Sequence, residues 1–409
     1  MDPIFQFSDE ELNDGGGDPR EELHTNPSEE DQEEVENLAP AIPPQEEVEN
    51  LAPTIPPRQI PELLIARIVA LVPRCQYPKL SLISRAFFRV ISSPELYIRR
   101  LQLGLTEPVL YALIGFPYSY ERFSRWHILN LNISESLREV PTFPPMYPGS
   151  SVVTFGYNMY VIGGLNGFNH PVSTVFVLDC RFHAWDNLPS MHRARYRAAA
   201  GVIDRKIYVI GGCERPHAYD GWIEVFDVDN GVWSTVPDPS HYNSNMPGGG
   251  FVTSVVMQDR IYILDALCAL VYEPRQGTWQ SLGLESSTLM DFWRQPCCVI
   301  EDLLYSFDVL CVLKHPIVVF DPVEMVWNPV KGLDDGLPYL RYSVCQMANV
   351  GGKLMVLATS NTIYNDTWCI EITLERREGG EIWGTVDSKE IVLISGTSPS
   401  IDLSCSVTV

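Results

Sequence analysis

Four tryptophans recur at nearly constant spacing through the middle of this 409-residue chain. They stand 48, 46 and 48 residues apart, at Trp185, Trp233, Trp279 and Trp327. Each lies six residues after an acid that ends a short apolar run, namely Asp179, Asp227, Glu273 and Asp321. An apolar run, acid, turn and tryptophan at this interval are typical of a repeat architecture in which each unit is one small sheet. We therefore expect a mainly β protein, built as a closed array of sheets.

Each repeat begins with an apolar strand, and the next strand ends in a glycine pair in the first two repeats, at Gly164 and Gly212. The pair decays later, where Asp265-Ala266 takes its place. In the fifth repeat Trp383 follows its acid, Glu371, by twelve residues, which indicates a longer hairpin. Five repeats thus occupy about residues 142–390.

The ends of this region supply strands that no repeat uses. Segments 108–116 and 125–131 precede the repeats, and segments 390–395 and 403–409 follow them. Because neither end makes a full sheet alone, we expect both to combine in a last blade that closes the ring and removes exposed edge strands. This arrangement predicts six blades, with seven as the alternative.

The negative charge is concentrated at the N-terminus. The chain has a formal net charge of −23, and residues 1–58 alone hold 17 acids and 2 bases. We expect this tail to be disordered, because it has few large apolar groups. It carries a 13-residue tandem duplication, at 33–45 and 46–58, which is either a copied spacer or an acidic docking segment. The remaining body is also acidic, which argues against nucleic acid or an anionic membrane as main partner.

The ten cysteines form no CxxC motif, and most lie in apolar runs. No basic segment followed by an apolar run opens the chain, and no stretch of 18 apolar residues occurs. We expect a reducing compartment, the cytoplasm or the nucleus.

Residues 59–102 have a helical pattern. Leu64, Ile68 and Leu71 share one helical face, and Pro61 fits a first turn. A second run, 79–91, places apolar residues on another stripe, and Ser93-Pro94 opens a third short helix. So thin a helical core usually gains stability from a partner or a neighbouring domain.

This helical segment, IPELLIARIVALVPRCQYPKLSLISRAFFRVISSPELYIRR, resembles an F-box. Ile60 stands where the family usually has leucine, which keeps an apolar side chain there. The glycine pairs resemble the kelch signature, and the whole chain resembles the F-box/kelch-repeat proteins common in plants. The resemblance implies an F-box at 59–102 followed by a kelch β-propeller at 103–409.

The resemblance also implies a function, that of the substrate-receptor subunit of an SCF-type cullin-RING ubiquitin ligase. The F-box would bind a Skp-type adaptor, and through it a cullin, while the propeller recruits a protein for ubiquitination. The subunit itself would be non-catalytic and need no cofactor. The expected adaptor contacts are Pro61, Leu64, Ile68, Val72, Pro73 and Leu80.

The alternative is a kelch scaffold outside any ligase, or a kelch-propeller enzyme, whose helices only pack on the propeller. Packing would bury a single stripe, whereas apolar residues here cover more than one. The sequence contains no GxSxG, HExxH or GxxxxGK[ST] motif and no ligand-spaced histidine pair. We therefore expect no catalytic or metal site.

One basic cluster stands out in the acidic domain, His192 to Arg197. Strand alternation predicts that loops 165–174, 188–196 and 213–221 emerge on one face of the propeller. The candidates for contact with a substrate on that face are Arg193, Arg195, Arg215 and His217. For Arg195 the alternative is a structural role, bonding loop carbonyls near the channel, and for the others it is pairing with local acids. The identity of the substrate is not encoded in any of these patterns.

Overall fold

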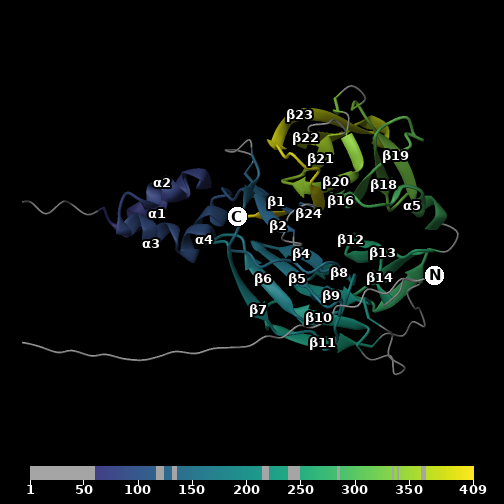
Figure 1. Ribbon diagram of the computed structural model, residues 1–409, viewed down its shortest axis with the longest axis horizontal. Helices are drawn as coiled ribbons and strands as arrows, with labels where there is room; N and C mark the ends of the chain where they lie inside the picture. The colour runs from purple at the N-terminus through teal and green to yellow at the C-terminus, as the bar shows by residue number, and fades with distance from the viewer. Residues whose placement is uncertain are drawn as a thin grey trace, which may run out of the picture. The chain divides into compact units, whose positions relative to one another are not determined.

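The computed structural model describes residues 60–116, 124–130, 136–213, 221–237, 249–282, 286–333, 336–338, 340–360 and 365–409. The acidic tail and two of the predicted recognition residues, Arg215 and His217, lie outside these residues. The described chain is mainly β, with a small helical region before a propeller-like arrangement of sheets (Figure 1). This confirms the predicted fold class.

The helical region contains four α-helices and one 3₁₀ turn: α1 (Glu62–Ala70), η1 (Arg74–Gln76), α2 (Tyr77–Ser81), α3 (Arg85–Ile91) and α4 (Pro94–Gln102). The expectation of one helix over 79–91 was wrong. Ser84 interrupts that run, because its backbone is extended and its hydroxyl accepts a hydrogen bond from the Phe87 amide. Their shared core comprises Ile65, Val69, Ala70, Phe87, Val90 and Leu96.

The strands form four-stranded sheets. The five repeats supply β4–β7 (Ser151–Phe155, Asn158–Ile162, Val175–Asp179, Ala184–Leu188), β8–β11 (Ala199–Ile203, Lys206–Ile210, Ile223–Asp227, Val232–Val236), β12–β15 (Thr253–Met257, Arg260–Leu264, Ala269–Glu273, Thr278–Ser281), β16–β19 (Cys297–Ile300, Leu303–Phe307, Ile317–Asp321, Val326–Lys331) and β20–β23 (Leu340–Val350, Lys353–Ser360, Thr367–Arg376, Ile382–Leu393). A short helix, α5 (Ser286–Phe292), precedes β16.

The spacing of acid and tryptophan is explained by the outer hairpin of each sheet. Asp227 pairs with Val232, so that Trp233 faces Phe226 across the two strands, with ring centroids 5.1 Å apart. The Asp227 carboxylate accepts hydrogen bonds from the amides of Asp229 and Asn230 in the turn. The acid therefore caps the turn, and the tryptophan packs on its neighbour strand.

The last sheet joins both ends of the domain. β24 (Ser400–Thr408) pairs with β1 (Pro108–Gly115), which continues to β2 (Arg125–Leu129) and β3 (Arg138–Glu139). The segment 390–395, expected in this sheet, belongs largely to β23 instead. The longer fifth hairpin carries β23 as far as Leu393, still paired with β22, and β3 takes the vacant edge.

Six such sheets are found among the described strands, and their innermost strands form a ring. β4, β8, β12, β16, β20 and β24 each contact the next, and β24 contacts β4 again. One irregularity joins two sheets at their outer edges, where β19 pairs with β23 in parallel through Val330 and Lys331. The described part of the chain contains no helix long and apolar enough to cross a membrane.

Deleting Ser400–Val409 tests the closure. The deletion removes the buried side chains of Ile401, Val407 and Val409 and leaves β1 an exposed edge. We expect the truncated protein to aggregate or to lose its cooperative thermal transition by calorimetry. Thr408→Lys, an exposed change in the same strand, should melt like the full chain. A truncated protein that melts as sharply and as high as the full chain would contradict a closing role for β24.

Candidate interaction surfaces

The strand directions give the propeller two distinct faces. Because the inner strands run the same way, the hairpins β4–β5 and β6–β7 and their counterparts lie on one side, here called the hairpin face. The loops between second and third strands, and the connections between sheets, lie on the other side, here called the loop face. The helical region contacts the hairpin face: the Tyr97 and Tyr157 rings meet edge to face at 4.9 Å, and Arg74 donates to the Arg181 carbonyl.

The helical region leaves an apolar surface uncovered. Helix α1 buries Ile65 and Val69, whereas Leu64 and Ile68 are 47% and 45% exposed. Of the predicted adaptor contacts, Pro61 and Pro73 are also exposed, while Val72 and Leu80 are half-buried. Further exposed apolar side chains adjoin this face in sequence, and they are Leu63, Leu71, Leu82, Ile83 and Phe88. The exposure of the last three could not be predicted from sequence, because the apolar spacing over 79–91 does not show that the helix is interrupted at Ser84.

A buried arginine holds the end of α1 in place. Arg100 donates to the carbonyl of Val72 at 2.8 Å and forms an ion pair of 2.5 Å with Glu107, the residue before β1. Its side chain is 4% exposed. A second bond from Arg100 reaches the Ala70 carbonyl. One guanidinium thus ties the apolar helix to the first strand of the propeller, a role that sequence reasoning missed.

On the loop face, loops 165–174 and 188–196 lie together as the alternation predicts. Val172 and Arg195 form an isolated antiparallel β-bridge, and the Gly164 amide donates to the Arg195 carbonyl at 2.8 Å. The structure places Arg195 itself in the interior, 1% exposed, which removes it from the candidates for direct contact. Its guanidinium donates to the carbonyls of Gly211 and Trp222 and pairs with Glu224 at 2.8 Å.

Glu224 organises the basic cluster around it. This fully buried carboxylate accepts from Arg195, from the His192 ring and from the backbone amides of His192 and Arg193. Arg193 is half-buried and packs its side chain beside Gly221. The basic cluster predicted from sequence therefore holds the loop together around Glu224. Nothing in the sequence marked Glu224 beyond its place in a strand.

The loop face also presents apolar side chains at fixed loop tips. Phe168, Leu267 and Leu310 are 84%, 74% and 84% exposed, on loops from three different sheets. The loop around Phe168 is held by the Asn166 side chain, which accepts from the amides of Phe168 and His170. The loop around Leu310 is held by buried Asp308, which accepts from the Leu313 amide at 2.7 Å. The tips are therefore preorganised, although large apolar side chains at exposed positions gain nothing from folding.

A funnel of about 900 Å³ lies inside the ring of inner strands, and it is lined by residues of all six of these strands or of the loops that precede them. Arg197 lies in its wall with a left-handed backbone, φ 52°, and its guanidinium stacks on Tyr196. Among the described residues no carboxylate pairs with Arg197. Asp402 contributes a negative charge to the same funnel. The described residues contain no group of His, Cys, Asp or Glu side chains placed to hold a metal ion.

The buried pair predicts a stability difference. Glu224→Gln leaves the Arg195 charge buried without its counter-ion, which typically costs about 3–5 kcal/mol of unfolding free energy. Asp229→Asn removes a pair with Arg205 in which both side chains are more than half exposed, and should cost far less because solvent screens such a pair. Urea denaturation measures both. Equal losses in the two variants would argue against a structural role for Glu224.

Comparison with known proteins identifies the family. A family model described as an FKB95 kelch-repeats domain matches residues 125–393. An F-box/kelch-repeat protein of Arabidopsis thaliana is 58% identical over 404 residues, 96% of each chain. An F-box/LRR-repeat/kelch-repeat protein of the same plant is 52% identical over 99% of each chain, and another F-box/kelch-repeat protein is 50% identical over 92% of this chain and 93% of its own. These matches agree with the helical region and the repeats that follow it, and this chain belongs to the F-box/kelch-repeat protein family.

Proposed function

We propose that this protein is the substrate-receptor subunit of an SCF-type cullin-RING ubiquitin ligase. The observation that carries the proposal is the apolar stripe of α1 formed by Leu64 and Ile68, which packing leaves uncovered although the opposite stripe is buried. A helix that served only to brace the propeller would not keep such a surface open to water. A groove in a Skp-type adaptor would cover it, as amphipathic helices are covered in helix-in-groove complexes.

The substrate would bind on the loop face, away from the adaptor. The helices contact the hairpin face, so the funnel and the exposed loop tips point to the other side. A protein held there gains affinity from burying Phe168, Leu267 and Leu310, and orientation from the charge of Arg197. The receptor would then contribute proximity, while bond formation takes place elsewhere in the assembly.

We place this activity in the cytoplasm or nucleus. All ten cysteines are free thiols in the structure, which agrees with a reducing compartment. Burial raises the pKa of several of them, to about 12 for Cys345 and Cys369, so these thiols are unreactive near neutral pH.

The adaptor surface is tested by changing Leu64 and Ile68 together to Ala. Both are exposed, so the fold should be unaffected, while each truncation at a well-packed interface costs about 2 kcal/mol of binding free energy. We expect affinity for a Skp-type adaptor, measured by calorimetry, to fall by at least about a hundredfold. The matched control is Val309→Ala with Leu310→Ala, two exposed apolar residues of the loop face, which should bind the adaptor normally. Unchanged affinity in the α1 variant would refute this surface.

The substrate surface is tested by Phe168→Ser combined with Leu310→Ser. Proteins that co-purify with the receptor from cells under proteasome inhibition should be lost, while adaptor binding and melting temperature are retained. Val323→Ser, at a 70% exposed site in a turn of the hairpin face, is the control and should keep the same proteins. If the two variants retain the same co-purifying set, recognition does not involve these loop tips.

A further inference from the structure

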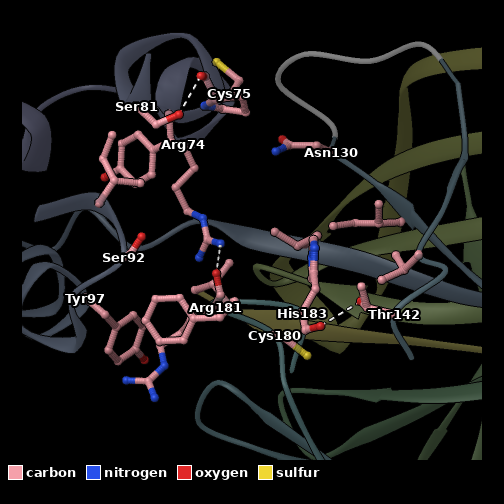
Figure 2. Close-up of a pocket in the computed structure, with 18 of the residues that line it drawn as sticks. Arg74, Cys75, Ser81, Ser92, Tyr97, Asn130, Thr142, Cys180, Arg181 and His183 are labelled. Atoms are coloured by element: carbon pink, nitrogen blue, oxygen red, sulfur yellow. Dashed lines mark hydrogen bonds between the residues drawn. The ribbon is translucent and has the colours of Figure 1, made fainter. Parts of the chain in front are cut away.

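A cavity of about 670 Å³ lies where the helical region meets the propeller. Its walls come from α2, α3 and α4 on one side, and from β3, the β6–β7 hairpin and the chain terminus on the other. Figure 2 shows Arg74 projecting from the helical side toward the Arg181 carbonyl, with His183 and Thr142 on the propeller side. The volume is within the range of small-molecule sites. Apart from Phe88, the residues named for the two surfaces described above lie outside its lining.

The charges around the cavity do not balance. Arg181 forms an ion pair with Asp179, and Glu139, the one acid among the described lining residues, pairs with Arg125. Two lining arginines, Arg74 and Arg138, remain without an ion pair among the described residues.

Arg74 is the more constrained of these two cations. Its guanidinium donates to the Arg181 carbonyl at 2.8 Å, and burial lowers its pKa. The carboxylate of Glu107 contacts Arg74 only at its backbone, where it accepts a hydrogen bond from the Arg74 amide. The same carboxylate forms its ion pair with the Arg100 guanidinium. A half-buried cation with unused donors is destabilised by lost hydration, and an anion in the cavity would compensate for that loss.

The rest of the lining is aromatic and largely neutral. Tyr77, Tyr97 and Tyr111 stand in the wall, and Phe88 and Phe182 are exposed at 58% and 39%. His183 bonds the Tyr111 hydroxyl at 3.1 Å through its Nε2, and burial followed by the Arg74 charge lowers the pKa of its ring. It therefore adds hydrogen-bonding capacity without a second fixed charge near neutral pH.

We propose that this cavity binds a small amphipathic organic anion, with its carboxylate or sulfonate group on the Arg74 guanidinium and a flat apolar body against Phe88, Phe182 and Tyr97. Such a ligand would touch the helical region and the propeller at once. Because it binds only when the two are in contact, it would stabilise their docked arrangement. The inference does not depend on the ligase function, since it rests on the cavity and its charges alone.

Two fluorescent probes of nearly the same shape test this in the full chain. 8-Anilino-1-naphthalenesulfonate is an aromatic anion, and N-phenyl-1-naphthylamine is its neutral counterpart. We expect Arg74→Gln to weaken binding of the anion about tenfold or more and to change affinity for the neutral probe less than about twofold. Arg85→Gln, an exposed arginine of α3 outside the cavity, is the matched control and should bind both probes like the parent.

Two further variants keep the test decisive. Arg138→Gln, whose side chain is exposed and whose loss should not disturb folding, should weaken the anion severalfold. Ser92→Trp, which fills the cavity from the end of α3, should weaken both probes at an unchanged melting temperature. Anion affinity that is unchanged in both arginine variants, an equal loss of the two probes in Arg74→Gln, or full binding of both in Ser92→Trp would each overturn the proposal.

Discussion

The pairing of β24 with β1 is the constraint on which the rest of this structure depends. It joins residues 285 to 300 positions apart in sequence, from Gly115 opposite Ser400 to Pro108 opposite Thr408. Without it, the sheets would be an open array with two exposed edges, and β4 and β20 would lose the inner strand that lies between them. The pairing also fixes where the helices attach, because Glu107 and Val409 exchange backbone hydrogen bonds immediately before β1 and after β24.

The two faces follow from this closure and from the even number of strands in each sheet. With four strands, the chain leaves each of the five repeat sheets on the side where it entered, so the connections between sheets gather on the loop face. The first sheet is entered midway, at β1, which brings the helical region to the opposite side. Separation of the helical surface from the loop tips is thus a result of strand count and of the point at which the ring is closed.

Much of this could be predicted from sequence where the signal is local or periodic. The interval from Asp227 to Trp233 reflects a four-residue turn and a cross-strand contact, so it recurs wherever that hairpin recurs. The break at Ser84 could not be predicted, because the apolar spacing continues across it and the capping bond is seen only in three dimensions. Nor could the role of Glu224 as the centre of the basic cluster be predicted. Its partners His192 and Arg195 are 29 to 32 positions away in sequence, in the connection between β7 and β8. The longer spacing from Glu371 to Trp383 indicated that β23 is extended, but the residue at which it ends depends on the length of β22, with which it pairs.

The arginines show most clearly why sequence proximity does not assign function. Arg193, Arg195 and Arg197 alternate within five positions, yet the fold separates them by the partner that each one finds. Arg195 meets a buried carboxylate and so supports the loop face from beneath, as Arg100 supports the end of α1. Arg197 and Arg74 reach cavities with no carboxylate partner among the described residues. The charge of a buried, paired cation is neutralised by its counter-ion within the fold, whereas a positioned cation without a counter-ion still attracts an anion. The distribution of counter-ions, rather than of arginines, therefore separates the structural sites of this protein from those that remain available for binding.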